Sequence, residues 1–316
     1  MGQERIDRSA AGRRCCRAFA GTLYRTRARV SGGSSFRPRV TTIFQKRGES
    51  EVRVMERMYI SRNGVVEKTR FVVPEGTRER KWRKVKGRDR NRRKENDRSA
   101  VRQLARFLNC NADSSGYLVT LNFSDKSMDK IFAGMDQDQA LEECQRQGSL
   151  FFRRLKRRQA GRPLCYAFVA SDMDGKTGEL VRRHIHAVIM GADADAIRES
   201  WKLGDCTDIR SLWSKEDFTG LAAYLIEQVR EVPGMMRFIP SRGANKPEIR
   251  ERVVEGSVDD EIKVQPGARV LDRSAYTAGS VVQYVRYLRR PPRNKRGGHK
   301  EGAKNDVDDE TEKQNA

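Results

Sequence analysis

Several features of other protein classes are missing from this sequence. No apolar run approaches the roughly 18 residues that a membrane-spanning helix requires. The first residues lack the hydrophobic core of a secretory signal peptide, and Ile6 stands where a myristoylation signal would have Ser or Thr. We therefore expect a cytoplasmic protein with no membrane partner.

Side chains that bind metals or form disulfides are also few. The six cysteines include no C-x-x-C pair, which removes support for a zinc finger, and scattered single cysteines in a cytoplasmic chain are usually reduced. Only three histidines occur in the 316 residues, and His184 and His186 are separated by a single residue. The third, His299, lies in a basic C-terminal stretch, so an imidazole-based function centres on the pair.

What the chain has in excess is positive charge. Its formal net charge is +22, and 34% of its residues are charged. A hydrophobic content of 37% is enough for a core over part of the chain. Such a charge excess favours a polyanionic partner, with nucleic acid first and an anionic membrane surface second.

Charge and hydrophobicity divide the chain into five segments. Residues 1–50 are a basic arm without periodicity, and residues 291–316 are a polar tail; we expect both to be disordered. Residues 51–96 contain a β-hairpin and a basic linker. Predicted strands and helices alternate over residues 97–248, and a strand and helix extension follows at residues 249–290.

The second segment contains two recognisable features. Asn63-Gly64 lies between two β-like runs, and this dipeptide is a strong hairpin signal. Residues 78–94 form a dense basic run. This run is either a solvated linker or a segment that contacts phosphates and gains affinity by counterion release.

Apolar periodicity and turn residues define the elements of the third segment. We expect helices over residues 99–109, 137–158, 193–201 and 219–230. We expect strands over residues 117–123, 164–171, 181–190 and 208–212.

The strand over residues 181–190 has the sequence VRRHIHAVIM. Because side chains alternate between the faces of a strand, both imidazoles should lie on one face and Ile185 on the other. Two neutral imidazoles side by side can form half of a divalent-metal site. The alternative is a solvated strand that happens to carry two histidines.

Four stretches, in this order, resemble the HUH endonucleases, the initiators of rolling-circle replication. The similarity is greatest to the replication-associated proteins of small single-stranded DNA phages and plasmids. YLVTLNF at residues 117–123 is similar to the family's first strand motif, and His184-Ile185-His186 matches its His-hydrophobic-His motif. Residues 222–225 (AAYL) resemble the nucleophile helix, and residues 241–247 resemble a loop that often follows it. The resemblance covers roughly residues 97–248.

The resemblance implies an α+β fold with a central antiparallel sheet and flanking helices. It implies a sequence- or structure-specific single-stranded DNA endonuclease, a nickase and ligase that initiates rolling-circle replication. Tyr224 would be the nucleophile and would form a 5′-phosphotyrosine, while His184 and His186 would bind Mg²⁺ or Mn²⁺. The partners would be single-stranded or hairpin DNA at an origin and a host polymerase or helicase, in the bacterial cytoplasm if the gene is carried by a phage.

The remaining metal ligand and the surroundings of the tyrosine follow the family pattern less closely. Family members often have Glu at the end of the strand before the hairpin turn, where this chain has Ser171 and Asp172. We expect Asp172 to be the third ligand, with Glu179 as the alternative. The family's lysine, one helical turn after the tyrosine, is replaced by Glu227 or Gln228.

The expected phosphate contacts are the cations of the predicted helix end, the histidine strand and the last loop. They are Arg153, Arg154, Lys156, Arg157, Arg158, Arg182, Arg183, Arg242 and Lys246. Tyr284 and Tyr287 lie among arginines and are alternative DNA contacts outside the motif order.

Two other functions fit the same motifs. One is a non-catalytic nucleic-acid-binding protein on the same scaffold, and the other is a single-tyrosine transposase of the HUH type.

Overall fold

A computed structural model gives the fold of the chain. It describes residues 52–74, 90–159, 161–206, 208–212, 216–277 and 281–289. The arm and tail expected to be disordered lie outside these ranges, as do residues 78–89 of the basic run.

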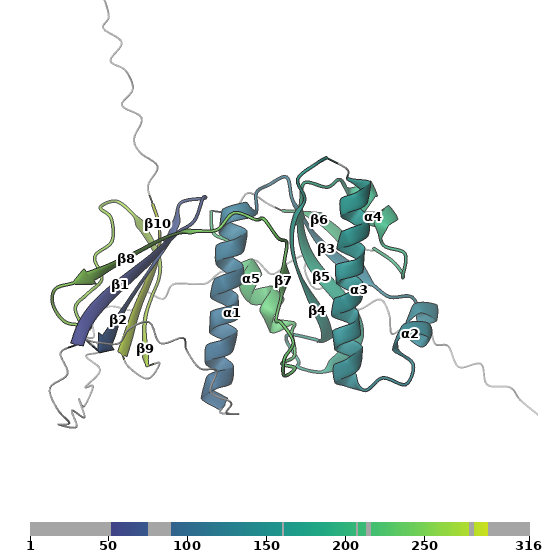
Figure 1. Ribbon diagram of the computed structural model, residues 1–316, viewed down its shortest axis with the longest axis horizontal. Coiled ribbons are helices and arrows are strands. Elements are labelled where there is room, and N and C mark those ends of the chain that lie inside the picture. The colour runs from purple at the N-terminus through teal and green to yellow at the C-terminus, as the bar shows by residue number, and fades with distance from the viewer. Residues whose placement is uncertain are drawn as a thin grey trace, which may run out of the picture. The chain divides into compact units, whose positions relative to one another are not determined.

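The described residues form two antiparallel five-stranded sheets and five helices (Figure 1). The α+β class is therefore confirmed, although a single central sheet was expected. The histidine sheet has the order β6-β3-β5-β4-β7, and the terminal sheet has the order β8-β1-β2-β10-β9. The strands are β1 (Val52–Ile60), β2 (Val65–Pro74), β3 (Tyr117–Asn122), β4 (Cys165–Met173), β5 (Leu180–Met190), β6 (Asp208–Ser211), β7 (Ile239–Pro240), β8 (Glu248–Val254), β9 (Arg269–Thr277) and β10 (Val281–Leu288). The helices are α1 (Arg90–Asn111), α2 (Asp125–Phe132), α3 (Gln137–Arg158), α4 (Ala194–Ser200) and α5 (Thr219–Glu227).

Strand β5 is the centre of the histidine sheet and pairs with β3 on one side and β4 on the other. Its odd-numbered residues from Ile185 to Ile189 are buried in the core beneath α3. Val188 and Met190 are buried in a second core with α1 and α5. Both faces of the sheet are therefore covered, which explains why β5 becomes a continuous apolar run after His186.

Helix α3 has the bounds that its periodicity predicts. Asp136 and Gln139 form a capping box at its start, and the stripe ending at Leu155 is buried against the sheet. Gly148 lies where the helix comes closest to β4, because a Cβ there would be 2.5 Å from the ring of Phe168. The missing side chain permits this close packing.

Helices α1 and α5 cover the opposite face of the histidine sheet (Figure 1). Leu104 and Leu108 of α1 and Leu225 of α5 are fully buried there. Helix α1 begins at Arg90, earlier than expected, because its first turns are charged and have no apolar periodicity from which to predict a helix.

The terminal sheet joins residues from both ends of the described chain. The β1–β2 hairpin turns at Asn63 and Gly64, as the dipeptide predicts, and β2 then pairs with β10 through Phe71 and Val282. The segment 249–290, expected to hold a strand and a helix, contributes β8, β9 and β10 to this sheet, and its described residues contain no helix.

None of the helices in the described ranges is both long enough and apolar enough to cross a membrane.

The contact between Gly148 and Phe168 yields a stability prediction. We expect Gly148→Ala to lower the free energy of unfolding by up to about 2 kcal/mol, because an overpacking cost of about 1–3 kcal/mol is offset by a helix-propensity gain of about 1 kcal/mol. Urea denaturation measures the change. In a Phe168→Leu background the same substitution should cost less, and an equal cost in both backgrounds would contradict the contact.

Candidate active site

The two histidines of β5 lie side by side on the face of the sheet that α5 covers. Their Nε2 atoms are 3.0 Å apart and their ring centroids are 4.6 Å apart. His186 is 7% exposed, and His184 is half-buried in the middle of the strand. The same-face arrangement expected from alternation is present.

Each imidazole is held by its outer nitrogen. Nδ1 of His184 is 2.9 Å from the carbonyl oxygen of Arg182. Because a carbonyl only accepts, this Nδ1 carries the proton and Nε2 keeps its lone pair. Nδ1 of His186 is 3.1 Å from Oγ1 of Thr120, and a hydroxyl can either donate or accept. Thr120 can therefore partner either tautomer of His186.

The donor set fits a divalent cation. The Nε2 atoms are 3.0 Å apart, within hydrogen-bond distance of each other, so the two imidazole nitrogens face each other and could both bind one metal ion. Burial lowers the pKa of His184. Burial and then repulsion from His184 hold the pKa of His186 well below its usual value. Both imidazoles are thus neutral near pH 7, as ligation requires.

The structure does not bring Asp172 or Glu179 to the histidine pair. Ser171 lies opposite His184 in the β4–β5 register, and the register shifts between Ser171 and Met173, where Asp172 lies. Asp172 is near enough to His184 to oppose the fall in its pKa that burial causes, but its carboxylate is paired elsewhere. The buried Asp172 carboxylate is 3.2 Å from Nη2 of Arg230. Among the described residues, no group of three or more His, Cys, Asp or Glu side chains is placed to hold a metal. The ligand roles of Asp172 and Glu179 remain predictions.

Tyr224 lies next to the histidines. Its ring centroid is 5.8 Å from that of His186, and its half-buried side chain packs against the core that α1 and α5 share. Glu227, one turn later, is exposed. The helix bearing Tyr224 and the histidine strand, predicted separately from sequence, therefore meet on one face of the sheet.

Gln228 anchors the end of the tyrosine helix, a role that the sequence did not reveal. Its Oε1 accepts a hydrogen bond from the backbone N–H of Gly175, and its carbonyl oxygen accepts one from Oγ of Ser171. A Cβ at Gly175 would collide with the Gln228 carboxamide. Gln228 thus fastens α5 to the turn that precedes the histidine strand.

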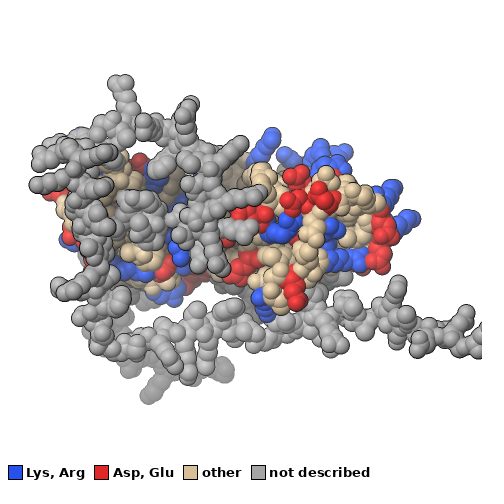
Figure 2. Space-filling view, turned by 90° about the horizontal axis from the view of Figure 1, so that it is seen from below, with Lys and Arg blue, Asp and Glu red and all other residues tan. Residues whose placement is uncertain are grey.

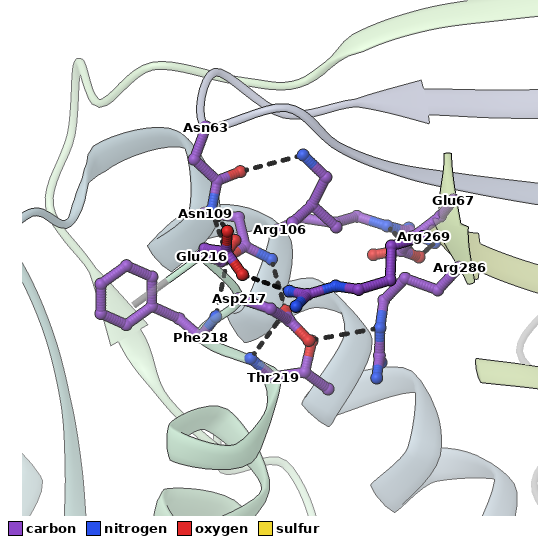
Figure 3. A network of polar contacts seen from close by, with 11 residues as sticks. Asn63, Glu67, Arg106, Asn109, Glu216, Asp217, Phe218, Thr219, Arg269 and Arg286 are labelled. Atoms are coloured by element: carbon purple, nitrogen blue, oxygen red, sulfur yellow. Dashed lines mark hydrogen bonds and ion pairs between the residues drawn. The ribbon is translucent and has the colours of Figure 1, made fainter. Parts of the chain in front are cut away.

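A polar network anchors the start of α5 (Figure 3). The Oδ1 atom of Asn109 accepts hydrogen bonds from the backbone N–H of Phe218 and from Nδ2 of Asn63, and Asn109 donates to Asp217. Asp217 in turn accepts from the backbone N–H of Thr219. The first turn of α5 is thereby tied to α1 and to the β1–β2 turn.

The cations expected to bind nucleic acid do not surround the histidine pair. Arg182 contacts Asp125 and Arg183 lies over the ring of Phe132, so both side chains are engaged near α2. The set from Arg153 to Arg158 ends α3, on the opposite face of the sheet. Arg242 and Lys246 are exposed on the loop after β7.

Tyr284 and Tyr287 are core residues of the terminal sheet. They are 2% and 3% exposed, and the guanidinium of Arg102 lies 4.2 Å from the centroid of the Tyr284 ring. Burial raises the pKa of Tyr284. The alternative that these rings contact DNA is therefore wrong for this arrangement.

No family model matches the sequence, and no curated protein or solved structure matches it significantly.

The lowered pKa values of the imidazoles predict a pH-dependent stability. An unfolded histidine has a pKa near 6.5, so below that pH the unfolded chain binds protons that the folded pair does not bind. Stability should therefore fall as the pH drops from 7.5 to 5.0. We expect His186→Gln to reduce this loss, as measured by urea denaturation at both pH values; the same loss in both proteins would contradict the assignment.

Proposed function

We propose that this chain is a single-stranded DNA endonuclease of the HUH type, a nickase and ligase that initiates rolling-circle replication. The observation that carries the proposal is the meeting of two imidazoles, with Nε2 atoms 3.0 Å apart, and Tyr224, whose ring centroid is 5.8 Å from that of His186. The order of the sequence motifs and the net charge of +22 also support it.

In this proposal His184 and His186 hold a divalent cation through their Nε2 atoms. When bound, Mg²⁺ or Mn²⁺ polarises the scissile phosphate and offsets the charge of the transition state. The pair would supply two nitrogen ligands to that cation. Thr120 and the carbonyl of Arg182 orient the rings for this role.

Tyr224 supplies the nucleophile. Its phenolic oxygen forms a bond to the phosphorus and loses its proton, while the bond to the 3′ oxygen breaks and that oxygen takes up a proton. The products are a 5′-phosphotyrosine and a 3′-hydroxyl that a polymerase can extend. Because one phosphodiester replaces another, the reverse reaction rejoins the strand without ATP.

A non-catalytic nucleic-acid-binding protein on the same scaffold is the second candidate. Two observations favour it. The Asp172 carboxylate is paired with Arg230. Gln228, which lies where the HUH proteins usually have a lysine one helical turn after the tyrosine, makes structural hydrogen bonds instead. Both candidates predict DNA binding, so only chemistry separates them.

A covalent adduct assay tests the proposal. Tiled single-stranded oligonucleotides from the genome that encodes the chain are incubated with the protein and Mn²⁺, and adducts are detected by denaturing electrophoresis. We expect an adduct that is lost in Tyr224→Phe and in His186→Ala but retained in Tyr117→Phe, a matched tyrosine on β3. An adduct that survives Tyr224→Phe would refute the nucleophile, and tight DNA binding without any adduct would favour the non-catalytic protein.

The hydroxyl of Thr120 gives a prediction for metal affinity. We expect Thr120→Val to weaken Mn²⁺ binding by about 10-fold or more, because loss of an outer partner frees the ring of a histidine ligand. Titration calorimetry measures the affinity, with Thr69→Val in the terminal sheet as the control. Equal affinities in the two variants would show that Thr120 does not orient the ligand.

A further inference from the structure

The last two turns of α3 carry cations without acidic partners. Arg153, Lys156 and Arg157 are exposed, line an open hollow of about 550 Å³, and have no carboxylate of the described residues within ion-pair distance. On the same helix, Arg146 pairs with Glu143 and Arg158 pairs with Glu199. On the face drawn in Figure 2, acidic and basic side chains are interspersed over the coloured residues. These three side chains therefore place exposed positive charge without an acidic partner at this helix end.

Arg154 lies at the base of this group. Its Nε and Nη2 atoms are buried, and neither has a hydrogen-bond partner among the residues that the structure describes. Burial, followed by repulsion from Arg157, lowers the pKa of Arg154. Because these two nitrogens are buried, they are not open to an incoming anion, and Arg154 adds positive charge behind the exposed cations of the group.

The basic group continues toward the loop after β7. Tyr166, at the start of β4, stacks on Phe152 of α3 with ring centroids 3.7 Å apart, and its backbone carbonyl accepts a hydrogen bond from Ser241. The neighbouring Arg242 is exposed and lies close enough to oppose the rise in the pKa of Tyr166 that burial causes. We define Arg153, Arg154, Lys156, Arg157 and Arg242 as the distal basic strip.

This strip is remote from the histidine pair. The start of α3 lies at the other end of β4, where Arg230 joins Asp138 to Asp172. From Asp138 to Arg154 the helix rises about 24 Å, at about 1.5 Å per residue. The helix also covers the face opposite that of His186 and Tyr224. A phosphate bound at the strip is therefore not the one that Tyr224 would attack.

We propose that the distal basic strip binds the backbone of a second segment of the DNA, separate from the segment at the histidine pair. This inference rests on the proposed function. The rise of about 24 Å between Asp138 and Arg154 alone equals about 7 nucleotides of backbone at about 3.4 Å each, so the second segment lies several nucleotides from the nick. Because the contacts are to phosphates, this binding does not depend on the DNA sequence.

An anionic membrane surface fits the strip less well than DNA. Membrane-surface binding combines cations with inserted apolar side chains. The large exposed apolar residues of the described chain are Met135, Leu180, Met236, Ile249, Val253 and Val270, and none lies in the C-terminal half of α3.

The test compares two triple variants with equal changes in charge. The strip variant is Arg153→Gln, Lys156→Gln and Arg157→Gln. The control is Arg198→Gln, Arg250→Gln and Arg269→Gln, which removes exposed arginines that are paired with carboxylates. Both carry Tyr224→Phe and are measured without metal, so the result does not depend on cleavage.

Fluorescence anisotropy gives the dissociation constants for a 10-nucleotide strand and for a 30-nucleotide strand with a hairpin, over a range of salt concentrations. We expect the strip variant to lose about 2–3 from the salt slope for the long DNA, at about 0.7–0.9 per phosphate contact, and the control to change little. The short strand cannot reach both surfaces at once, so its salt slope should change less in the strip variant than the slope of the long DNA.

Equal losses in both variants, or an equal loss for the short strand, would overturn the inference. Retained DNA binding together with lost binding to phosphatidylserine vesicles would also overturn it, and would assign the strip to a membrane. Failure of the adduct assay with this salt-slope result intact would remove the nickase and leave the second DNA surface.

Discussion

The hydrogen bonds of the buried Asn109 carboxamide join the terminal sheet to the start of the tyrosine helix α5, and the position of that helix depends on them. Asn109 is 1% exposed and joins the β1–β2 turn through Asn63 to the start of α5 through Phe218 and Asp217. A buried amide without partners is costly, so this set of hydrogen bonds is satisfied together or not at all. The place of Tyr224 beside the histidines therefore depends on a sheet that contributes no residue to the site.

The sequence predicts those strands and helices that show a regular apolar pattern over their own residues. Alternation around His184 and His186 and the apolar stripe of α3 were sufficient to predict both elements and the shared face of the imidazoles. The terminal sheet could not be predicted, because its β2–β10 pair joins residues from opposite ends of the chain. Its buried charges also make the strands hard to recognise. Glu56 and Arg70 are buried on the sheet and form an ion pair, although charged residues in a strand usually indicate a solvated face.

At the candidate site too, contacts between residues far apart in the sequence could not be predicted. Sequence order favoured Asp172 as a ligand, but its direction depends on the β4–β5 register and on Arg230, which comes from beyond α5. The anchoring of Gln228 to Gly175 likewise requires a helix end and a turn that meet only in the fold. The candidate catalytic residues therefore lie close together, and the distal basic strip proposed to bind nucleic acid lies far from them.

The terminal sheet has a consequence for synthesis on the ribosome. Strands β1 and β2 emerge early, but β2 gains its second neighbour only when Val282 and the rest of β10 have been made. The histidine sheet, complete at Pro240, can close while the N-terminal hairpin still has a bare edge. A nascent or truncated chain ending before β10 presents the edge of β2, which includes Val65 and Val66, as a template for pairing with another molecule. The last strand therefore protects the chain from aggregation as well as completing its fold.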